Sequence, residues 1–380
     1  MTVTPDRGFR LDGLLDHGLR DLDISAAEHA LAVTRYTDLG GCFDDHWSAT
    51  RGDNLVMPQG SFLLGTVVRN IDRNEGIDID LVAIRDVSKF STTQTELKKD
   101  AGVAVSNYRS SPNSDAPETS ECSRCFTLTW HGMHLDVLPA IPNPAPPGGI
   151  LITDKDVVRW LPSNPKGYAG WFRAQMVEQL EHQRVILAKE LEIEEVPEWQ
   201  VKTTLQRAVQ ALKRHRDIYF ADRDGKPTSV VLTTLAAMAY QGGDDIYEVL
   251  RSVTGRMGDL LVKVNGRWTL PNPAQPGEDF MDSWAADPER AEMFFEWLDT
   301  AQQTFDEFGL RHGLDYSVPL LGQAFGDRFA KAASRGLAST MHGARQDRSL
   351  RAASGGLIVG AMTAGSHRVK EHSFRGGSTA

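Results

Sequence analysis

Residues 57–86, "MPQGSFLLGTVVRNIDRNEGIDIDLVAIRD", place a small flexible turn ahead of two acids in an apolar run. Gly60 and Ser61 form the turn, and Asp78 and Asp80 enclose a single isoleucine within the run. Side chains of a β-strand alternate between its two faces, so both carboxylates are expected on one face and the isoleucines on the other. Two like charges at this spacing are costly unless a cation lies between them, which indicates a metal site.

A third acid occurs later in a second strand-like run. The stretch "MHLDVLPA", residues 133–140, places Asp136 between apolar neighbours, as expected for a buried strand. Mg²⁺ takes oxygen ligands and leaves positions for water and substrate phosphates, and Mn²⁺ can replace it. Three carboxylates would hold two such ions about 4 Å apart, which activates an attacking hydroxyl and stabilises a leaving pyrophosphate. A lone Asp-x-Asp also occurs at solvated strand edges, but the order of turn, acid pair and third acid favours a metal site.

Composition limits the classes of function. The chain has 380 residues, of which 41% are apolar and 24% charged, as in ordinary globular proteins. A net charge of −10 disfavours constitutive binding of long nucleic acid, which leaves a basic footprint. No apolar run is long enough to span a membrane, and the N-terminus shows no secretory signal. Three cysteines argue against a disulfide framework, so we expect a cytoplasmic protein.

The first half of the chain predicts a sheet accompanied by helices. Residues 25–28, "SAAE", form a capping box, which predicts a helix from there to about Arg35 or Leu39. The two glycines at 40–41 are expected to end it. Residues 61–140 carry repeated β signals.

Three shorter segments refine this half. Residues 93–108, "TQTELKKDAGVAVSNY", predict a helix between the β signals. "HG" at 131–132 predicts a tight hairpin connection. "AIPNPAPPGG" at 140–149 is rich in proline and is expected to be a hinge or domain boundary.

The second half predicts helices. From Trp171 onward, apolar residues recur at helical spacing, for example Phe172, Met176 and Leu180. The last stretch, 353–380, is rich in Gly, Ser and Ala with little periodicity, and it is expected to be mobile. The whole pattern predicts an α+β fold.

These motifs resemble a known superfamily. "GSFLLGT", "DIDLV" and "LDVLP" match, in order, the Gly-Ser turn, the acid pair and the third acid of the DNA polymerase β-like nucleotidyltransferases. The segments "LQRAVQALKRHRD", "PTSVVLTTLAAMAY" and "LPNPAQPGEDFMDSW" are similar to those of the cGAS/DncV-like nucleotidyltransferases (CD-NTases) of bacterial CBASS anti-phage systems. The resemblance covers roughly residues 25–340.

The resemblance implies an architecture. It implies a polymerase β-like mixed sheet with an N-terminal spine helix in residues 1–165, packed against a C-terminal helical lobe of OAS/cGAS type in residues 166–345. A flexible tail, 346–380, would follow. The active site would lie between the sheet and the helical lobe.

The resemblance also implies roles for individual residues. The metal-binding acids would be Asp78, Asp80 and Asp136, with Mg²⁺ as the cofactor. The nucleotide-binding residues would be Gly60 and Ser61 in the phosphate turn, Lys213 at the triphosphate and Ser229 beside it.

Simple chemistry is consistent with the last two roles. Ser229 opens a predicted helix. Its hydroxyl, together with the free amides and the dipole of the helix, favours an anion. Lys213 offers a point charge to phosphate. The alternative is that Lys213 belongs to a solvated basic run, "KRHR".

Two further features have a simpler interpretation. Trp284 is interpreted as a structural residue buried between the lobes. "CSRC", with His131 and His134, has the residue types of a zinc site. Its spacing lacks the long insert of a zinc finger, and His134 falls on the same strand face as Asp136, so zinc is disfavoured.

The expected function is synthesis of a cyclic di- or trinucleotide from ATP, GTP or other NTPs, with release of pyrophosphate. The base choice, ring size and 2′ or 3′ linkage stay open. One alternative is a nucleotidyltransferase that acts on RNA or a small molecule. Another is a catalytically silent binding protein, which the intact acid triad disfavours.

The expected partners follow from the same resemblance. NTPs are the substrates, an effector is reached only through the nucleotide product, and no membrane partner is expected. The tail ending at Ala380 resembles C-termini that CBASS ubiquitin-transfer-like enzymes conjugate to targets. The alternative is an ordinary frayed terminus.

Overall fold

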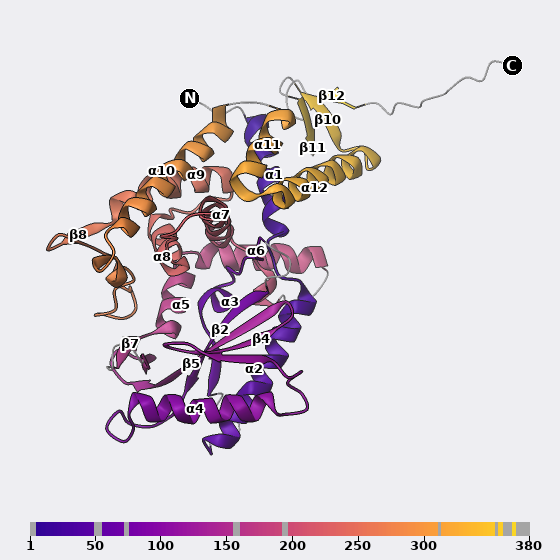
Figure 1. Ribbon diagram of the computed structural model, residues 1–380. Coiled ribbons are helices and arrows are strands. Elements are labelled where there is room, and N and C mark those ends of the chain that lie inside the picture. The colour runs from indigo at the N-terminus through magenta and orange to yellow at the C-terminus, as the bar shows by residue number, and fades with distance from the viewer. Residues whose placement is uncertain are drawn as a thin grey trace.

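In Figure 1, a computed structural model, a mixed sheet lies on one side of a large group of helices. The structure describes residues 5–48, 55–71, 76–154, 160–191, 197–310, 313–353, 356–359 and 367–369.

The main sheet has the strand order β1-β2-β5-β4-β3, with β6 paired to β5 and β7 paired to β6. Its strands are β1 (Val56–Pro58), β2 (Ile77–Ile84), β3 (Glu118–Glu121), β4 (Phe126–Trp130), β5 (Met133–Asn143), β6 (Gly149–Ile152) and β7 (Leu161–Ser163). The β2–β5 pair is parallel, and the other pairs are antiparallel. The α+β prediction is therefore confirmed.

One face of the sheet is covered by α2 (Ala26–His46) and α4 (Gln94–Arg109), which run beneath it in Figure 1. Ile77, Ile79 and Leu81 point into this layer and are at most 4% exposed. Each fully buried side chain of this type contributes about 1.5–3 kcal/mol. The predicted alternation of β2 is confirmed, and it leaves the aspartates on the opposite face.

The predicted end of α2 is wrong. The capping box of Ser25 and Glu28 begins the helix as expected, but the helix continues through the glycine pair to His46. Leu39 and Phe43, on either side of the pair, are fully buried against the sheet. Their burial outweighs the roughly 1 kcal/mol by which each glycine disfavours a helix.

The proline-rich stretch 140–149 is also not a boundary. β5 continues into it as far as Asn143, and the chain then turns back into β6, which pairs antiparallel with β5. The hairpin predicted at 131–132 is confirmed, because β4 ends at Trp130 and β5 begins at Met133.

The helices above the sheet share one core around α7, most of whose residues are buried. They are α1 (Pro5–Arg20), α5 (Pro165–Ala174), α7 (Thr204–Tyr219), α8 (Ser229–Ala239), α9 (Ile246–Met257), α10 (Glu289–Leu310), α11 (Leu314–Phe325) and α12 (Asp327–Gln346). α6 (Val177–Leu191) instead packs through Leu180 against Val201 in a smaller cluster. Short elements are α3 (Gly60–Leu64), η1 (Glu198–Gln200), η2 (Gly258–Leu260), β8 (Val262–Val264), β9 (Arg267–Thr269) and η3 (Asp282–Ala285). α1 packs against α12 and α9, so the first helix completes the core of the last ones.

A small antiparallel sheet follows α12, within the stretch that was expected to be a mobile tail. It contains β10 (Leu350–Ala353), β11 (Gly356–Val359) and β12 (His367–Arg368). Leu350 is only 5% exposed, which anchors this sheet. Ala380, the proposed conjugation terminus, lies outside the described residues. The domain limits at 165 and 345 stay predictions.

Across the described ranges, every helix is too short or too polar to cross a membrane.

His215 gives the helical core a pH dependence. Its ring is buried beside Phe305 and Phe325, and Trp297 Nε1 donates to His215 Nδ1 at 3.1 Å. Burial lowers the pKa of His215 from 6.5 to about 4. The folded state therefore binds fewer protons at His215 than the unfolded state between these values, and the stability from this group falls as the pH is lowered from 6.5 to 4.

We expect the free energy of unfolding to lose about 3 kcal/mol from His215 between pH 6.5 and pH 4. Denaturant unfolding at several pH values measures it, and His215→Gln should remove this part of the slope. His342→Gln, the same change at an exposed histidine, should leave the slope unchanged. Equal slopes in the wild type and His215→Gln would contradict the prediction.

Candidate active site

The three predicted acids occupy one face of adjacent strands. In the parallel β2–β5 pair, Asp80 lies opposite Asp136 and Asp78 lies opposite His134. On the other side of β5, Thr127 of β4 lies opposite Asp136, and its Oγ1 donates to Asp136 Oδ1 at 2.5 Å. Asp80, Asp136 and Thr127 thus form one row across three strands, which we call the acid row.

The acids interact electrostatically. The pKa of Asp80 is raised from 3.8 to about 6, first by burial and then by the negative charges of Asp136 and Asp78. Lys213 opposes this shift. Asp78 is exposed, while Asp80 and Asp136 are partly buried. Carboxylates held this close are the condition that a divalent cation relieves.

The turn at Gly60 lies directly against Asp80. The Gln59 amide donates to the Asp80 carbonyl at 2.8 Å, and α3 begins at the next residue. Gly60 has φ +56°, and a Cβ placed on it would be 2.3 Å from Asp80 Oδ2. Only glycine fits there, because both the left-handed backbone and the contact exclude a side chain. Ser61 follows in the first turn of α3.

A row of side-chain donors fixes the chain that follows α3. We call residues 64–69 the carbonyl segment, because its backbone carbonyls accept hydrogen bonds from α7 and the residues just before it. The bonds are Gln206 Nε2 to Leu64 O (2.9 Å), Lys202 Nζ to Gly65 O (2.7 Å), Lys213 Nζ to Thr66 O (3.1 Å), Gln210 Nε2 to Val67 O (2.8 Å), and Arg214 Nη2 to Arg69 O. The helical half therefore positions the loop that leads from the Gly60 turn toward β2.

Gln206 and Gln210 were not among the site residues predicted from the sequence. Their signal is present, because Gln206, Gln210 and Lys213 recur at helical spacing beside the apolar stripe of α7. All three are at most 6% exposed. A polar stripe at this spacing usually faces water. Only the tertiary structure shows that it faces backbone carbonyls instead.

The structure brings Lys213 close to Asp80, and Arg216, three residues further along α7, bonds Ser229. Burial, together with the charge of Arg216, lowers the pKa of Lys213 to about 7, and Asp80 opposes the shift. Arg216 Nη1 donates to Ser229 Oγ at 3.0 Å and to Pro227 O at 3.0 Å. Ser229 is the first residue of α8, as predicted.

The interpretation of "KRHR" as a solvated run is wrong. Lys213, Arg214, His215 and Arg216 are 4–6% exposed. The cationic groups of Lys213, Arg214 and Arg216 bond carbonyls, a hydroxyl and Asp217 inside the protein.

In the part of the chain that the structure describes, no three His, Cys, Asp or Glu side chains converge into a group that could hold a metal ion. No such group forms among the described residues Cys122, Cys125, His131 and His134 either. The acid row nevertheless fits Mg²⁺ by its carboxylate donors and by the mutual repulsion that raises the pKa of Asp80.

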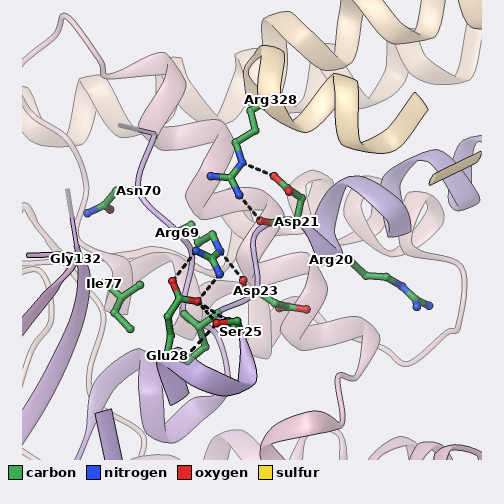
Figure 2. A pocket seen from close by; sticks show the side chains of 11 residues that line it. Arg20, Asp21, Asp23, Ser25, Glu28, Arg69, Asn70, Ile77, Gly132 and Arg328 are labelled. Atoms are coloured by element: carbon green, nitrogen blue, oxygen red, sulfur yellow. Dashed lines mark hydrogen bonds and ion pairs between the residues drawn. The ribbon is translucent and has the colours of Figure 1, made fainter. Parts of the chain in front are cut away.

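Trp284 is buried at 5% exposure, but it packs against Phe294 in the helical core rather than between the lobes. A separate cavity of about 660 Å³ lies near the turn between α1 and α2. Figure 2 shows its ion pairs, in which Arg69 meets Glu28 and Arg328 meets Asp21.

Known proteins resemble the chain in sequence. No family model matches it. The c-di-GMP synthase of Roseivirga ehrenbergii is 30% identical over 285 residues, which cover 73% of this chain and 74% of that protein. The cyclic dinucleotide synthase CdnG of Bradyrhizobium diazoefficiens is 27% identical over 399 residues, covering 94% of this chain and 93% of that protein.

Solved structures share the fold. CdnG of Bradyrhizobium diazoefficiens in complex with GTP has a TM-score of 0.68 at 24% identity, covering 86% of this chain and 99% of that chain. Escherichia coli DncV in its 3′-deoxy GTP bound form has a TM-score of 0.58 at 13% identity, covering 82% and 94%.

The sequence relatives define the chain as a nucleotidyltransferase, and its mixed sheet and helical half share the fold of CdnG and DncV. Within this class, the chain belongs to the cGAS/DncV-like nucleotidyltransferases, as its sequence identity over most of its length shows. The family resemblance inferred from the sequence is confirmed.

The contact between Gly60 and Asp80 predicts that Gly60→Ala disturbs the acid row. A Cβ would clash with the carboxylate and strain the backbone. We expect NTP turnover to fall roughly tenfold or more, the effect of about 1.4 kcal/mol in the transition state. Gly41→Ala is the control, because that helical site has open space and φ is ordinary. Turnover of Gly60→Ala near the wild-type rate would refute the contact's role.

The hydrogen bonds to the carbonyl segment should affect both the free energy of unfolding and the affinity for NTPs, whereas a similar bond elsewhere should affect only the free energy of unfolding. Gln206→Leu leaves Leu64 O without its donor and should lower the free energy of unfolding by about 1–3 kcal/mol. It should also raise KM for NTPs, because the loop beside Gly60 loses its support. Gln302→Leu removes a similar bond to Thr254 O, deep in the helical half, and should lower stability alone. Equal KM values in both variants would show that Gln206 is only structural.

Proposed function

We propose that the protein joins nucleoside triphosphates into a cyclic dinucleotide and releases pyrophosphate. The observation that carries this proposal is the acid row beneath the Gly60 turn, with Lys213 of α7 facing Asp80. The relatives named c-di-GMP synthase and CdnG support the cyclic product. GTP is the first substrate to test, since CdnG was solved in complex with it. ATP is the second.

Asp78, Asp80 and Asp136 would hold Mg²⁺, or Mn²⁺ in its place. The ions would lower the pKa of the attacking hydroxyl and neutralise the charge on the leaving pyrophosphate. Carboxylate oxygens are suitable ligands, and binding would relieve the repulsion that raises the pKa of Asp80. The side chains would have to turn toward one another to complete this ligand set.

The protein's own side chains and amides would bind the phosphates and accept the proton of the attacking hydroxyl. Gly60 and Ser61 would contact the phosphates through backbone amides and the hydroxyl. Lys213 would exchange its bond to Thr66 for the triphosphate, and Ser229 would bind beside it. Thr127 occupies Oδ1 of Asp136, so Oδ2 is the atom we assign to the proton of the attacking ribose hydroxyl.

Ring closure would repeat the same step. The linear intermediate would reverse in the site, which brings its remaining 5′-triphosphate to the turn. Its free hydroxyl would then attack the α-phosphorus of that triphosphate and release a second pyrophosphate. Transfer to RNA is the alternative, and the net charge of −10 disfavours it. Transfer to a small molecule is a second alternative that an acceptor-free reaction distinguishes.

The cellular setting belongs to the proposal. We infer an anti-phage role of CBASS type in the cytoplasm, where the NTP substrates are found, with an effector that responds to the nucleotide product. Conjugation through Ala380 by a ubiquitin-transfer-like enzyme is part of the same hypothesis.

The test is pyrophosphate release from GTP and ATP with Mg²⁺ and no added acceptor. Asp80→Asn keeps the shape but removes the charge, so the rate should fall by roughly a hundredfold or more. Asp86→Asn, an exposed site just after β2, is the control and should retain activity. Chromatography and mass spectrometry should show a phosphatase-resistant cyclic product. Near wild-type release by Asp80→Asn, or a product that forms only with an acceptor, would overturn the proposal.

A further inference from the structure

Cys122 and Cys125 face each other across the turn that joins β3 to β4. Glu121 pairs with Phe126 at the ends of these strands, and the Cys122 amide donates to the Cys125 carbonyl at 2.9 Å. The two cysteines therefore continue the antiparallel register, and only Ser123 and Arg124 separate them.

This geometry permits a disulfide without a large backbone movement. Opposed residues of antiparallel strands have Cα atoms about 4.5–5.5 Å apart, which lies within the range of about 4.4–6.8 Å that disulfides join. The two thiols already contact each other through a side-chain hydrogen bond. Lys98 Nζ donates to the carbonyls of Cys122 and Ser123, which holds the turn in place.

The pair is in contact with the acid row. Cys122 Sγ lies 3.7 Å from Thr127 Oγ1, and the same hydroxyl donates to Asp136 at 2.5 Å. Cys125 directly precedes β4 and lies two residues before Thr127. Two contacts thus connect the sulfur of Cys122 to the carboxylate of Asp136.

The two thiols differ in reactivity. Cys122 is exposed, whereas Cys125 is partly buried. Burial, and then the charges of Asp136 and Cys122, raise the pKa of Cys125 to about 12. Exposed thiols react first with oxidants, so Cys122 is the attacking sulfur and Cys125 resolves the product.

We propose that Cys122 and Cys125 form a reversible oxidation site, at which hydrogen peroxide produces a disulfide that lowers nucleotidyl transfer. This inference rests on the proposed function, because its effect passes through Asp136. The disulfide would bond the sulfur of Cys122 to that of Cys125 and remove its contact with Thr127. The hydrogen bond from Thr127 would then fix the position of Asp136 less firmly.

The chemistry balances with peroxide as the oxidant. The Cys122 thiolate attacks one peroxide oxygen, the O–O bond breaks, and the leaving hydroxide takes up the thiol proton as water. The Cys125 sulfur then attacks the sulfenic sulfur, the S–O bond breaks, and the oxygen leaves with two protons as a second water. Each disulfide consumes one peroxide, and a dithiol such as dithiothreitol reverses the reaction.

The experiment uses the full chain, with peroxide as the probe. Intact mass and peptide mapping identify the disulfide, and pyrophosphate release from GTP is measured before oxidation, after it, and after dithiothreitol. The wild type should lose two hydrogens, form the 122–125 link, lose roughly fivefold in rate, and recover on reduction. The variant with both Cys122→Ser and Cys125→Ser should keep its rate in peroxide. Cys42→Ser, the change at the remaining cysteine, should behave as the wild type.

Three results would overturn the inference: no 122–125 link, a link with an unchanged rate, or stoichiometric zinc bound to the two thiols in the purified protein. If the reduced enzyme releases no pyrophosphate from GTP, both the proposed function and the predicted loss of rate are refuted. Peptide mapping still decides separately whether the disulfide forms.

Discussion

The structure depends on the hydrogen bonds between α7 and the carbonyl segment. Five side chains of the helical half donate to five of the six backbone carbonyls from Leu64 to Arg69. Buried carbonyls without donors cost free energy, so this segment is stable in its path only while α7 is present. Because α3 and Gly60 directly precede the segment, the position of the turn over Asp80 is a property of both halves together.

The same contact explains why so many charged residues of α7 are buried. Lys213 and Arg216 are stable inside the protein because carbonyl and hydroxyl oxygens accept hydrogen bonds from them. Asp217 balances the charge of Arg216. Burial weakens the preference of Lys213 for its charged form, while Asp80 strengthens it. A phosphate near Lys213 would also favour the charged form of this lysine, as Asp80 does. The ammonium group of Lys213 therefore couples the substrate electrostatically to the acid row.

Local patterns predicted those parts of the fold that depend on neighbours in sequence. The alternation in β2, the capping box at Ser25 and the hairpin before Met133 are all decided within a few residues. The extent of α2 could not be predicted, because burial of Phe43 against a distant sheet determines it. For the same reason, the sequence placed the acids on strands but could not show that Thr127 bonds Asp136 or that Gln206 supports the turn.

The packing of α1 against α12 and α9 has a consequence for biosynthesis. Leu14, Leu15 and Leu19 of the first helix are almost fully buried, in a core that residues near Phe329 complete. A ribosome delivers the chain from its N-terminus, so α1 emerges hundreds of residues before its partner. Contacts between the two ends close late, because bringing distant segments together has the largest entropic cost. A nascent chain therefore carries its acids long before the scaffold around them is complete, because α12 is synthesised after them.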